Sequence, residues 1–137
     1  MTEPASDDLI DGLVQTSFVV VALLSQVAAA HDLSLTQLRV LAILRDREPK
    51  IAELATYLGL ERSSVSGLVD RSVARGLVRR APGGDDGRVV RVSLTEEGRR
   101  FAAALSGEFA VVAAPMIDKL GRAEQKRLNA LLVKFLD

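Results

Sequence analysis

Apolar residues recur along most of this chain at intervals of three and four positions, which is the spacing of one face of an α-helix. The predicted helices span residues 6–30, 35–46, 50–58, 62–75, 96–114 and 122–136. Two helix ends carry clear signals, because Ser34 and Gln37 form the pattern of a capping box and Gly59 suits a left-handed residue. Pro115 is expected to kink or interrupt the fifth helix, because it has no N–H group. The sequence therefore predicts a mainly α-helical protein.

A different pattern separates the fourth predicted helix from the fifth. Residues 77–80 suit a β-strand, and residues 88–94 alternate between apolar and polar side chains. The stretch between them, residues 82–87, consists of Pro, Gly and Asp, which are residues of tight turns. We expect a β-hairpin directly after two helices that are joined by a short turn. This arrangement is a winged helix-turn-helix.

The first predicted helix is apolar on nearly all sides, since residues 12–30 carry no charged side chain. A membrane span needs about 20 predominantly apolar residues and usually has basic flanks. Here acidic residues precede the stretch, and polar side chains interrupt it at Gln15, Thr16, Ser17, Ser25 and Gln26. The last helix carries a second apolar stripe at Leu128, Leu131, Leu132 and Phe135. We expect a homodimer formed by residues 6–30 and 96–136, a cytoplasmic location and no membrane partner.

The net charge is zero, but the charges are distributed unevenly. Residues 1–38 contain five acids and no Lys or Arg, whereas residues 62–91 contain seven arginines and three aspartates. Arginine suits planar contacts with phosphates and bases. The sequence therefore indicates double-stranded DNA as a partner. The expected units are an N-terminal dimerisation helix (1–32), a DNA-binding region (33–95) and C-terminal dimerisation helices (96–137).

The fourth predicted helix has two distinct faces on a helical wheel. One face groups Val65, Leu68, Val69 and Ser72 and is expected to point into the core. The opposite face is small and polar near the N-terminus, so the backbone can approach the major groove closely. Its serines bind bases with little discrimination. The candidate DNA-binding residues are Arg62, Ser63, Ser64, Ser66, Gly67, Arg71, Asp86, Arg88 and Arg91.

The tip of the predicted hairpin carries Asp85, Asp86 and Arg88. An arginine on a hairpin can enter a narrow minor groove, where the negative potential is enhanced. A neighbouring aspartate would hold the guanidinium in position. We expect Arg91, farther along the strand, to contact phosphate.

These blocks, in this order and at this spacing, resemble the MarR (multiple antibiotic resistance regulator) family. The resemblance runs from Leu33 to Gly98 and rests on residues 34–41, 53–55, 63–71, 75–80, 86–88 and 92–98. It implies a dimeric repressor with interlocking outer helices, in which residues 62–75 read the major groove of a pseudo-palindromic operator and Arg88 reads the minor groove. Two positions depart from the family pattern. Ser72 occupies a position where relatives commonly have a larger apolar residue. Gly67 occupies a position where relatives often have a basic side chain.

The resemblance also implies a cleft, between the dimerisation and DNA-binding parts, that accepts small aromatic or anionic effectors. For a carboxylate, His31 and Arg39 are the candidates, because no Lys or Arg precedes Arg39. The chain has no cysteine and one histidine, which argues against thiol chemistry, a metal site and an arsenic-repressor type of metal sensor. We expect no enzyme activity and no cofactor. A winged helix used only for protein contacts is the remaining alternative.

Overall fold

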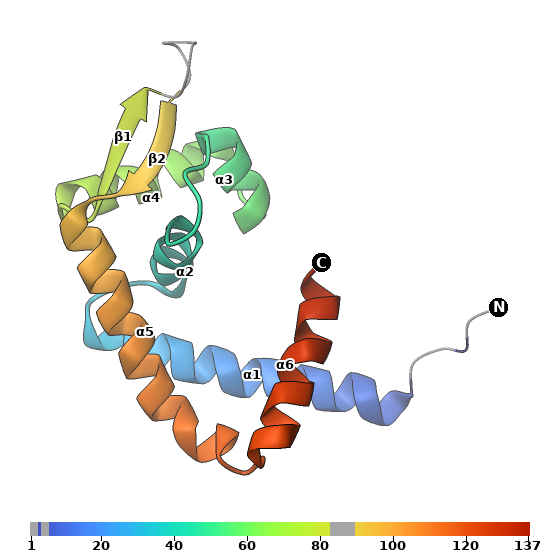
Figure 1. Cartoon of the computed structure of the whole chain (residues 1–137). Helices are drawn as coiled ribbons and strands as arrows, with labels where there is room; N and C mark the ends of the chain where they lie inside the picture. The colour runs from blue at the N-terminus through green and yellow to red at the C-terminus, as the bar shows by residue number, and fades with distance from the viewer. Residues whose placement is uncertain (1–2, 4–5, 83–89) are drawn as a thin grey trace.

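The computed structural model describes Glu3, residues 6–82 and residues 90–137. The elements in chain order are α1 (Asp7–Ala30), α2 (Leu35–Leu44), α3 (Ile51–Leu58), α4 (Arg62–Ala74), β1 (Val78–Pro82), β2 (Val90–Leu94), α5 (Glu96–Ile117) and α6 (Arg122–Leu136). Strands β1 and β2 pair antiparallel in a two-stranded sheet. Figure 1 shows α2, α3, α4 and the hairpin at one end of the molecule and the long helices α1, α5 and α6 at the other. The predicted fold class is confirmed.

Several helix ends follow directly from the residues that cap them. The Ser6 side chain accepts a hydrogen bond from the Leu9 N–H at the start of α1. Ser34 and Gln37 form the expected capping box at the start of α2, with both of its hydrogen bonds present. Gly59 ends α3 in the left-handed region at φ 67°. These ends were predictable because each depends only on neighbouring residues.

Of the two effects expected of Pro115, an interruption of the fifth helix is wrong, because α5 continues past it to Ile117. Proline leaves the carbonyl four residues earlier without its helical donor. That carbonyl belongs to Val111, a residue that is 73% exposed within one chain. The helix therefore ends one turn later than the sequence pattern indicated.

The winged-helix core lies between α2, α3, α4 and the hairpin. Its fully buried side chains are Val40, Leu41, Leu54, Val65, Val69 and Val92. The inward face predicted for α4 is confirmed, since Val65, Leu68, Val69 and Ser72 are its buried residues. The Ser72 hydroxyl donates a hydrogen bond to the Leu68 carbonyl at 3.0 Å, which offsets the cost of burying it. Helix α2 contributes Val40 to this core. Ala42 of the same helix is exposed and lines the apolar cavity that is described below.

A tight joint connects the winged helix to α5. Thr95 caps α5 by accepting the Gly98 N–H, and its hydroxyl donates to the Gly76 carbonyl at 2.6 Å. The Thr95 N–H donates to the Leu77 carbonyl at 3.0 Å. Gly98 lies directly against that carbonyl, so a side chain there would collide with backbone. The end of α4 and the start of α5 are therefore held as one unit.

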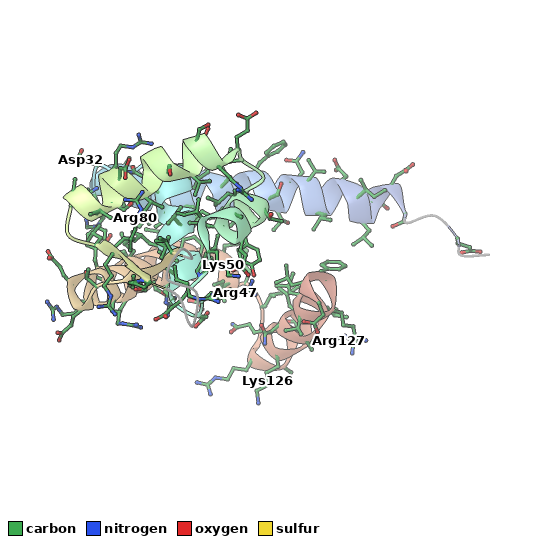
Figure 2. The ribbon with its side chains drawn as sticks, turned by 90° about the horizontal axis from the view of Figure 1, so that it is seen from above. Asp32, Arg47, Lys50, Arg80, Lys126 and Arg127 are labelled. Carbon is green, nitrogen blue, oxygen red and sulfur yellow. The ribbon has the colours of Figure 1, made fainter. Side chains whose placement is uncertain are left out.

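The long helices leave large apolar faces uncovered within one chain. Helices α1 and α5 are each long and apolar enough to cross a membrane by length and composition alone, and both are mostly exposed. Helix α6 buries none of its residues and stands apart from the winged-helix part in both views (Figures 1 and 2). The most exposed large apolar side chains of the three helices are Leu9, Leu13, Phe18, Val111, Phe135 and Leu136. Exposed apolar faces of this kind are typical of surfaces that contact another protein chain or a membrane.

Candidate nucleic-acid interface

The helix-turn-helix is formed by α3 and α4. The turn is closed by the Leu60 N–H, which donates to the Ala55 carbonyl at 3.0 Å. Helix α4 then begins at Arg62, with its Val65 N–H bonded to the Glu61 carbonyl at 3.1 Å. Because Val65 and Val69 are buried, the opposite face of α4 must point to solvent.

That outward face carries the residues predicted for α4. Arg62, Ser63 and Ser64 are exposed in its first turn, Ser66 and Gly67 are half-buried, and Arg71 is exposed. The start of α2 lies beside this face and, together with it, forms a shallow groove of about 480 Å³. Its lining residues are Ser34, Thr36, Leu60, Ser63, Ser64, Gly67, Leu68 and Arg71. The sequence did not indicate Ser34 and Thr36 as part of this surface, because only tertiary packing brings them to α4.

Gly67 and Arg71 are linked by local geometry. A Cβ atom built on Gly67 would lie 3.5 Å from the Nη1 atom of Arg71, so the guanidinium extends back over the glycine. Residues four apart on a helix are neighbours, so a Cβ alone would make an ordinary contact with this guanidinium, and a longer side chain at position 67 would compete for its space. The absent side chain thus leaves room for the Arg71 cation to lie along the outward face of α4.

Asp70 is the acid on this face, and Arg80 neutralises it. The Arg80 Nη2 atom lies 2.7 Å from the Asp70 carboxylate and 3.5 Å from the Ser66 carbonyl. Arg80 belongs to β1, so the pair joins the base of the hairpin to α4. An exposed ion pair of this kind adds little stability, but it removes a negative charge that would repel phosphate. Arg80 was not among the predicted site residues, since its pairing depends on strand–helix packing.

The hairpin residues fall into two groups. Asp86 and Arg88 lie outside the described residues. Arg91 is described, and its guanidinium donates to the Glu48 carbonyl at 3.0 Å and lies 3.9 Å from the Glu53 carboxylate. Arg91 therefore ties β2 to the α2–α3 connection and to α3, which leaves it less free for the phosphate contact we expected.

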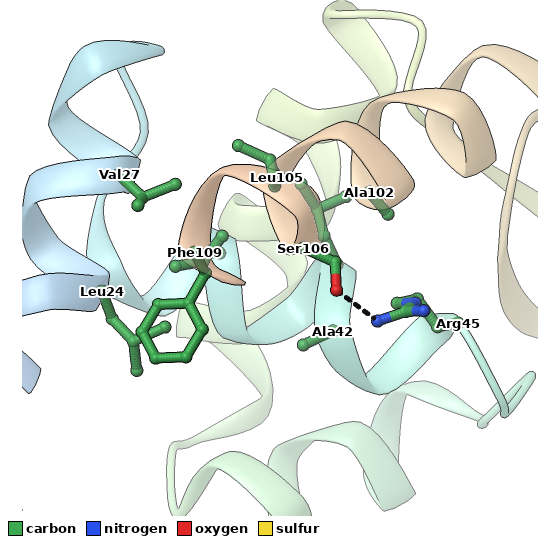
Figure 3. Close-up of a pocket in the computed structure, with 10 residues that line it drawn as sticks. Leu24, Val27, Ala42, Arg45, Ala102, Leu105, Ser106 and Phe109 are labelled. Carbon is green, nitrogen blue, oxygen red and sulfur yellow. Dashed lines mark hydrogen bonds between the residues drawn. The ribbon is translucent and has the colours of Figure 1, made fainter. Parts of the chain in front are cut away.

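A separate apolar cavity of about 150 Å³ lies between α1, α2 and α5. Its walls include Leu24, Val27, Ala42 and Phe109 (Figure 3). At its rim, the Arg45 Nη1 atom donates to the Ser106 hydroxyl at 3.3 Å.

Neither of the basic side chains predicted to bind an effector lines this cavity. His31 lies 2.7 Å from the Glu108 carboxylate, and Arg39 donates to the Tyr57 carbonyl at 2.8 Å. The cation at the cavity is Arg45, which sequence reasoning missed because it lies 61 residues from its partner Ser106. Among the described residues, no three His, Asp or Glu side chains gather as metal ligands.

Comparison with known proteins agrees with this geometry. The sequence model of the MarR family matches residues 31–89. The chain is 31% identical to the HTH-type transcriptional repressor NicR of Pseudomonas putida, over 85% of this chain and 74% of NicR. It is 32% identical to the HTH-type transcriptional repressor IacR of Pseudomonas putida, over 74% of this chain and 61% of IacR. It spans 44% of the HTH-type transcriptional regulator YfiV of Bacillus subtilis.

The fold is shared over nearly the whole chain with solved structures. RV1404 from Mycobacterium tuberculosis has a TM-score of 0.75 and 28% identity, covering 99% of this chain and 96% of that chain. The apo form of MarR from Escherichia coli has a TM-score of 0.75 and 24% identity, covering 98% of this chain and 100% of that chain. The likeness therefore includes the outer helices as well as the winged helix.

Proposed function

The chain belongs to the MarR family of transcriptional regulators, and we propose that it is a cytoplasmic, homodimeric repressor that binds a pseudo-palindromic DNA operator. The family is one of regulators rather than enzymes. The observation that carries the proposal is the outward face of α4, which is small, polar and flanked by Arg62 and Arg71. The names of NicR and IacR support repression as the direction of control.

The geometry suits α4 as the helix that enters the major groove. Its first turn offers three exposed residues, and a recognition helix contacts base edges with its N-terminal residues. The serines donate or accept and so bind without strong base preference. Arg62 and Arg71 supply the charge that attracts the phosphate backbone. Sequence preference is then shared between these contacts, the hairpin and the shape of the DNA.

A second copy of this chain is the partner that best fits the exposed helices. Helix α1 carries three acidic residues in its N-terminal part, Asp7, Asp8 and Asp11, and contains no Lys or Arg. Helix α6 carries four basic residues, which are Arg122, Lys126, Arg127 and Lys134. These acids and bases form no ion pairs with one another within the described part of one chain. In a twofold dimer, α1 of one protomer can lie against α6 of its partner, which pairs both the charges and the apolar faces.

The test of the proposed function is a binding titration on the DNA upstream of the protein's own gene, followed by footprinting. Binding should weaken steeply with salt, because phosphate contacts release counterions. The footprint should cover two half-sites separated by about 10 base pairs. No salt-dependent binding to any duplex would indicate a winged helix used only for protein contacts. An asymmetric footprint of one half-site would contradict the dimeric arrangement.

Replacing Arg88 tests the role of the hairpin. Arg88→Ala should weaken operator binding by about 1–3 kcal/mol and lower the salt slope by about one counterion. The loss should be larger on operators with A·T-rich flanks, where the minor groove is narrow. Fluorescence anisotropy across a salt series measures both effects. Arg100→Ala is the matched control, because Arg100 is exposed on α5 and pairs with Glu96 alone among the described acids. If Arg88→Ala and wild type bind every operator with equal affinity, whatever its flanking sequence, a DNA contact by Arg88 is excluded.

The cavity between α1, α2 and α5 supports control by a small effector. Its walls are apolar and its rim carries Arg45, so it fits a compact ring or chain with one negative charge. The helices around it belong to both the dimerisation part and the winged helix. A ligand that binds one arrangement of these parts better than another would shift the affinity for DNA.

The charge preference of this cavity can be measured with two simple probes. Benzoate should weaken DNA binding by wild type at a lower concentration than the neutral analogue benzamide. In Arg45→Gln this preference should fall about tenfold, because a charge-assisted hydrogen bond is lost. The measurement is the DNA dissociation constant across a titration of each probe. An unchanged preference in Arg45→Gln would place the anion away from Arg45.

A further inference from the structure

The end of the recognition helix is tied to the end of α1 by one side chain. Arg75 is the residue that ends α4, and its Nη1 and Nη2 atoms donate to the carbonyls of Asp32 and His31 at 3.3 and 3.1 Å. Both carbonyls belong to the turn at the C-terminus of α1. The last turn of α1 itself contains no basic residue. Arg75 thus brings a positive charge to the negative end of α1 from a distant part of the chain.

The same guanidinium also contacts α5. Its central carbon lies 5.7 Å from the centre of the Phe101 ring, in a cation–π arrangement. The His31 imidazole meets the same ring edge-on at 5.4 Å and lies 2.7 Å from the Glu108 carboxylate. Arg75 and Phe101 therefore join α1, α4 and α5 at one junction.

The turn that receives Arg75 has a fixed shape. Asp32 is the one non-glycine residue with positive φ in the described part of the chain, at 56°. The Leu33 N–H donates to the Ala28 carbonyl at 2.9 Å and holds the turn in this form. Two adjacent carbonyls on a rigid turn match the planar fork of a guanidinium, which a single ammonium cannot reproduce. The contact therefore specifies an orientation as well as a distance.

We propose that Arg75 is a positioning residue, which sets the angle between the recognition helix and the dimerisation helices and thereby the operator half-site spacing that the dimer accepts. This inference rests on the proposed DNA-binding function. Helix α4 has 13 residues, so it is about 20 Å long. A tilt of about 10° at the Arg75 end moves its N-terminal end by about 3.5 Å, which is about the rise of one base pair. A small change in the tilt of α4 at the Arg75 junction thus produces a large displacement of the helix end that meets the DNA.

Arg75 is exposed, and its hydrogen bonds are to neutral carbonyls at the surface, so it contributes little to folding. Its loss should therefore act on geometry while the fold persists. Circular dichroism melting and sedimentation of Arg75→Ala should match wild type closely. If they do not, Arg75→Lys serves as the second variant, because it keeps the charge and the stem and loses only the fork.

The experiment compares three operators that differ only in the number of base pairs between their half-sites. One has the native spacing, one has one base pair more, and one has one base pair fewer. Wild type should prefer the native spacing. In Arg75→Ala this preference should fall about threefold to thirtyfold, with Arg75→Lys in between, and the salt slope should not change. Arg100→Ala should behave as wild type on all three operators.

Three other outcomes have distinct meanings. If the salt slope of Arg75→Ala falls by one counterion while the spacing preference is kept, Arg75 is a phosphate contact and the proposal is wrong. If neither quantity changes, the junction does not position α4 and the proposal is also wrong. If wild type itself binds no duplex, the proposed function fails, and this inference fails with it.

Discussion

Gly98→Ala should destabilise the folded protein by about 2–4 kcal/mol, although alanine is the better helix former. A Cβ on Gly98 would lie 2.9 Å from the Leu77 carbonyl carbon and closer still to the carbonyl oxygen. Both atoms belong to the backbone, and that oxygen already accepts the Thr95 N–H. Neither side can rotate away, so α5 and the start of β1 must separate. The separation would strain the Thr95 hydrogen bonds to Gly76 and Leu77.

The measurement is thermal unfolding followed by circular dichroism, with an expected drop in the midpoint of about 10 °C. Gly107→Ala is a matched control, because Gly107 lies in the same helix and nothing stands within 4 Å of the place that an alanine methyl group would take there. That change should leave the midpoint equal or slightly higher. Similar midpoints for the two variants would show that the approach of Gly98 to Leu77 is less close than the structure indicates.

Phe18→Glu should abolish dimerisation and, with it, tight operator binding. Phe18 is 66% exposed in one chain, in the middle of the uncharged part of α1. If the apolar side chains of a second copy cover this face, a glutamate there would lose its hydration in the part of α1 that carries no charged side chain. The dimer dissociation constant should rise more than about a hundredfold, because an unpaired buried charge costs about 3 kcal/mol or more.

Sedimentation at micromolar concentration tests this expectation directly. Phe18→Leu is the matched control and should remain dimeric, because it keeps an apolar side chain. The monomer should bind a palindromic operator no better than an isolated half-site, since the second half-site no longer gains from effective concentration. A dimeric Phe18→Glu protein would mean that this face of α1 does not form the contact between protomers.

The Gly98 and Phe18 predictions concern the contacts that position the winged helix within the protein. They do not concern the surface of the winged helix that meets DNA. Gly98 and Thr95 connect the winged helix to α5, and Arg75 connects it to the turn after α1. In a dimer, these joints would place two copies of α4 relative to each other. If such a dimer binds a palindrome, its affinity would then depend on residues that touch no nucleobase.

The sequence by itself determined the features that depend on neighbouring residues. Ser34 and Gln37 cap α2 as predicted, and Gly59 ends α3, because each interaction closes within a few positions along the chain. The buried face of α4 was predictable for the same reason, since the helical period alone places Val65 and Val69 together. The interruption expected at Pro115 does not occur, because proline removes one helical hydrogen bond and can kink a helix without ending it.

Only the tertiary structure decided which partners the charged side chains take. The phosphate contact expected of Arg91 stays a prediction, and the structure adds a bond from its guanidinium to the Glu48 carbonyl, 43 positions away. Arg45, rather than Arg39 or His31, stands at the apolar cavity. Arg75 reaches the end of α1 across a similar separation in the chain. A long, flexible cationic side chain can serve many acceptors equally well, so its role depends on which elements the folded core brings within its reach.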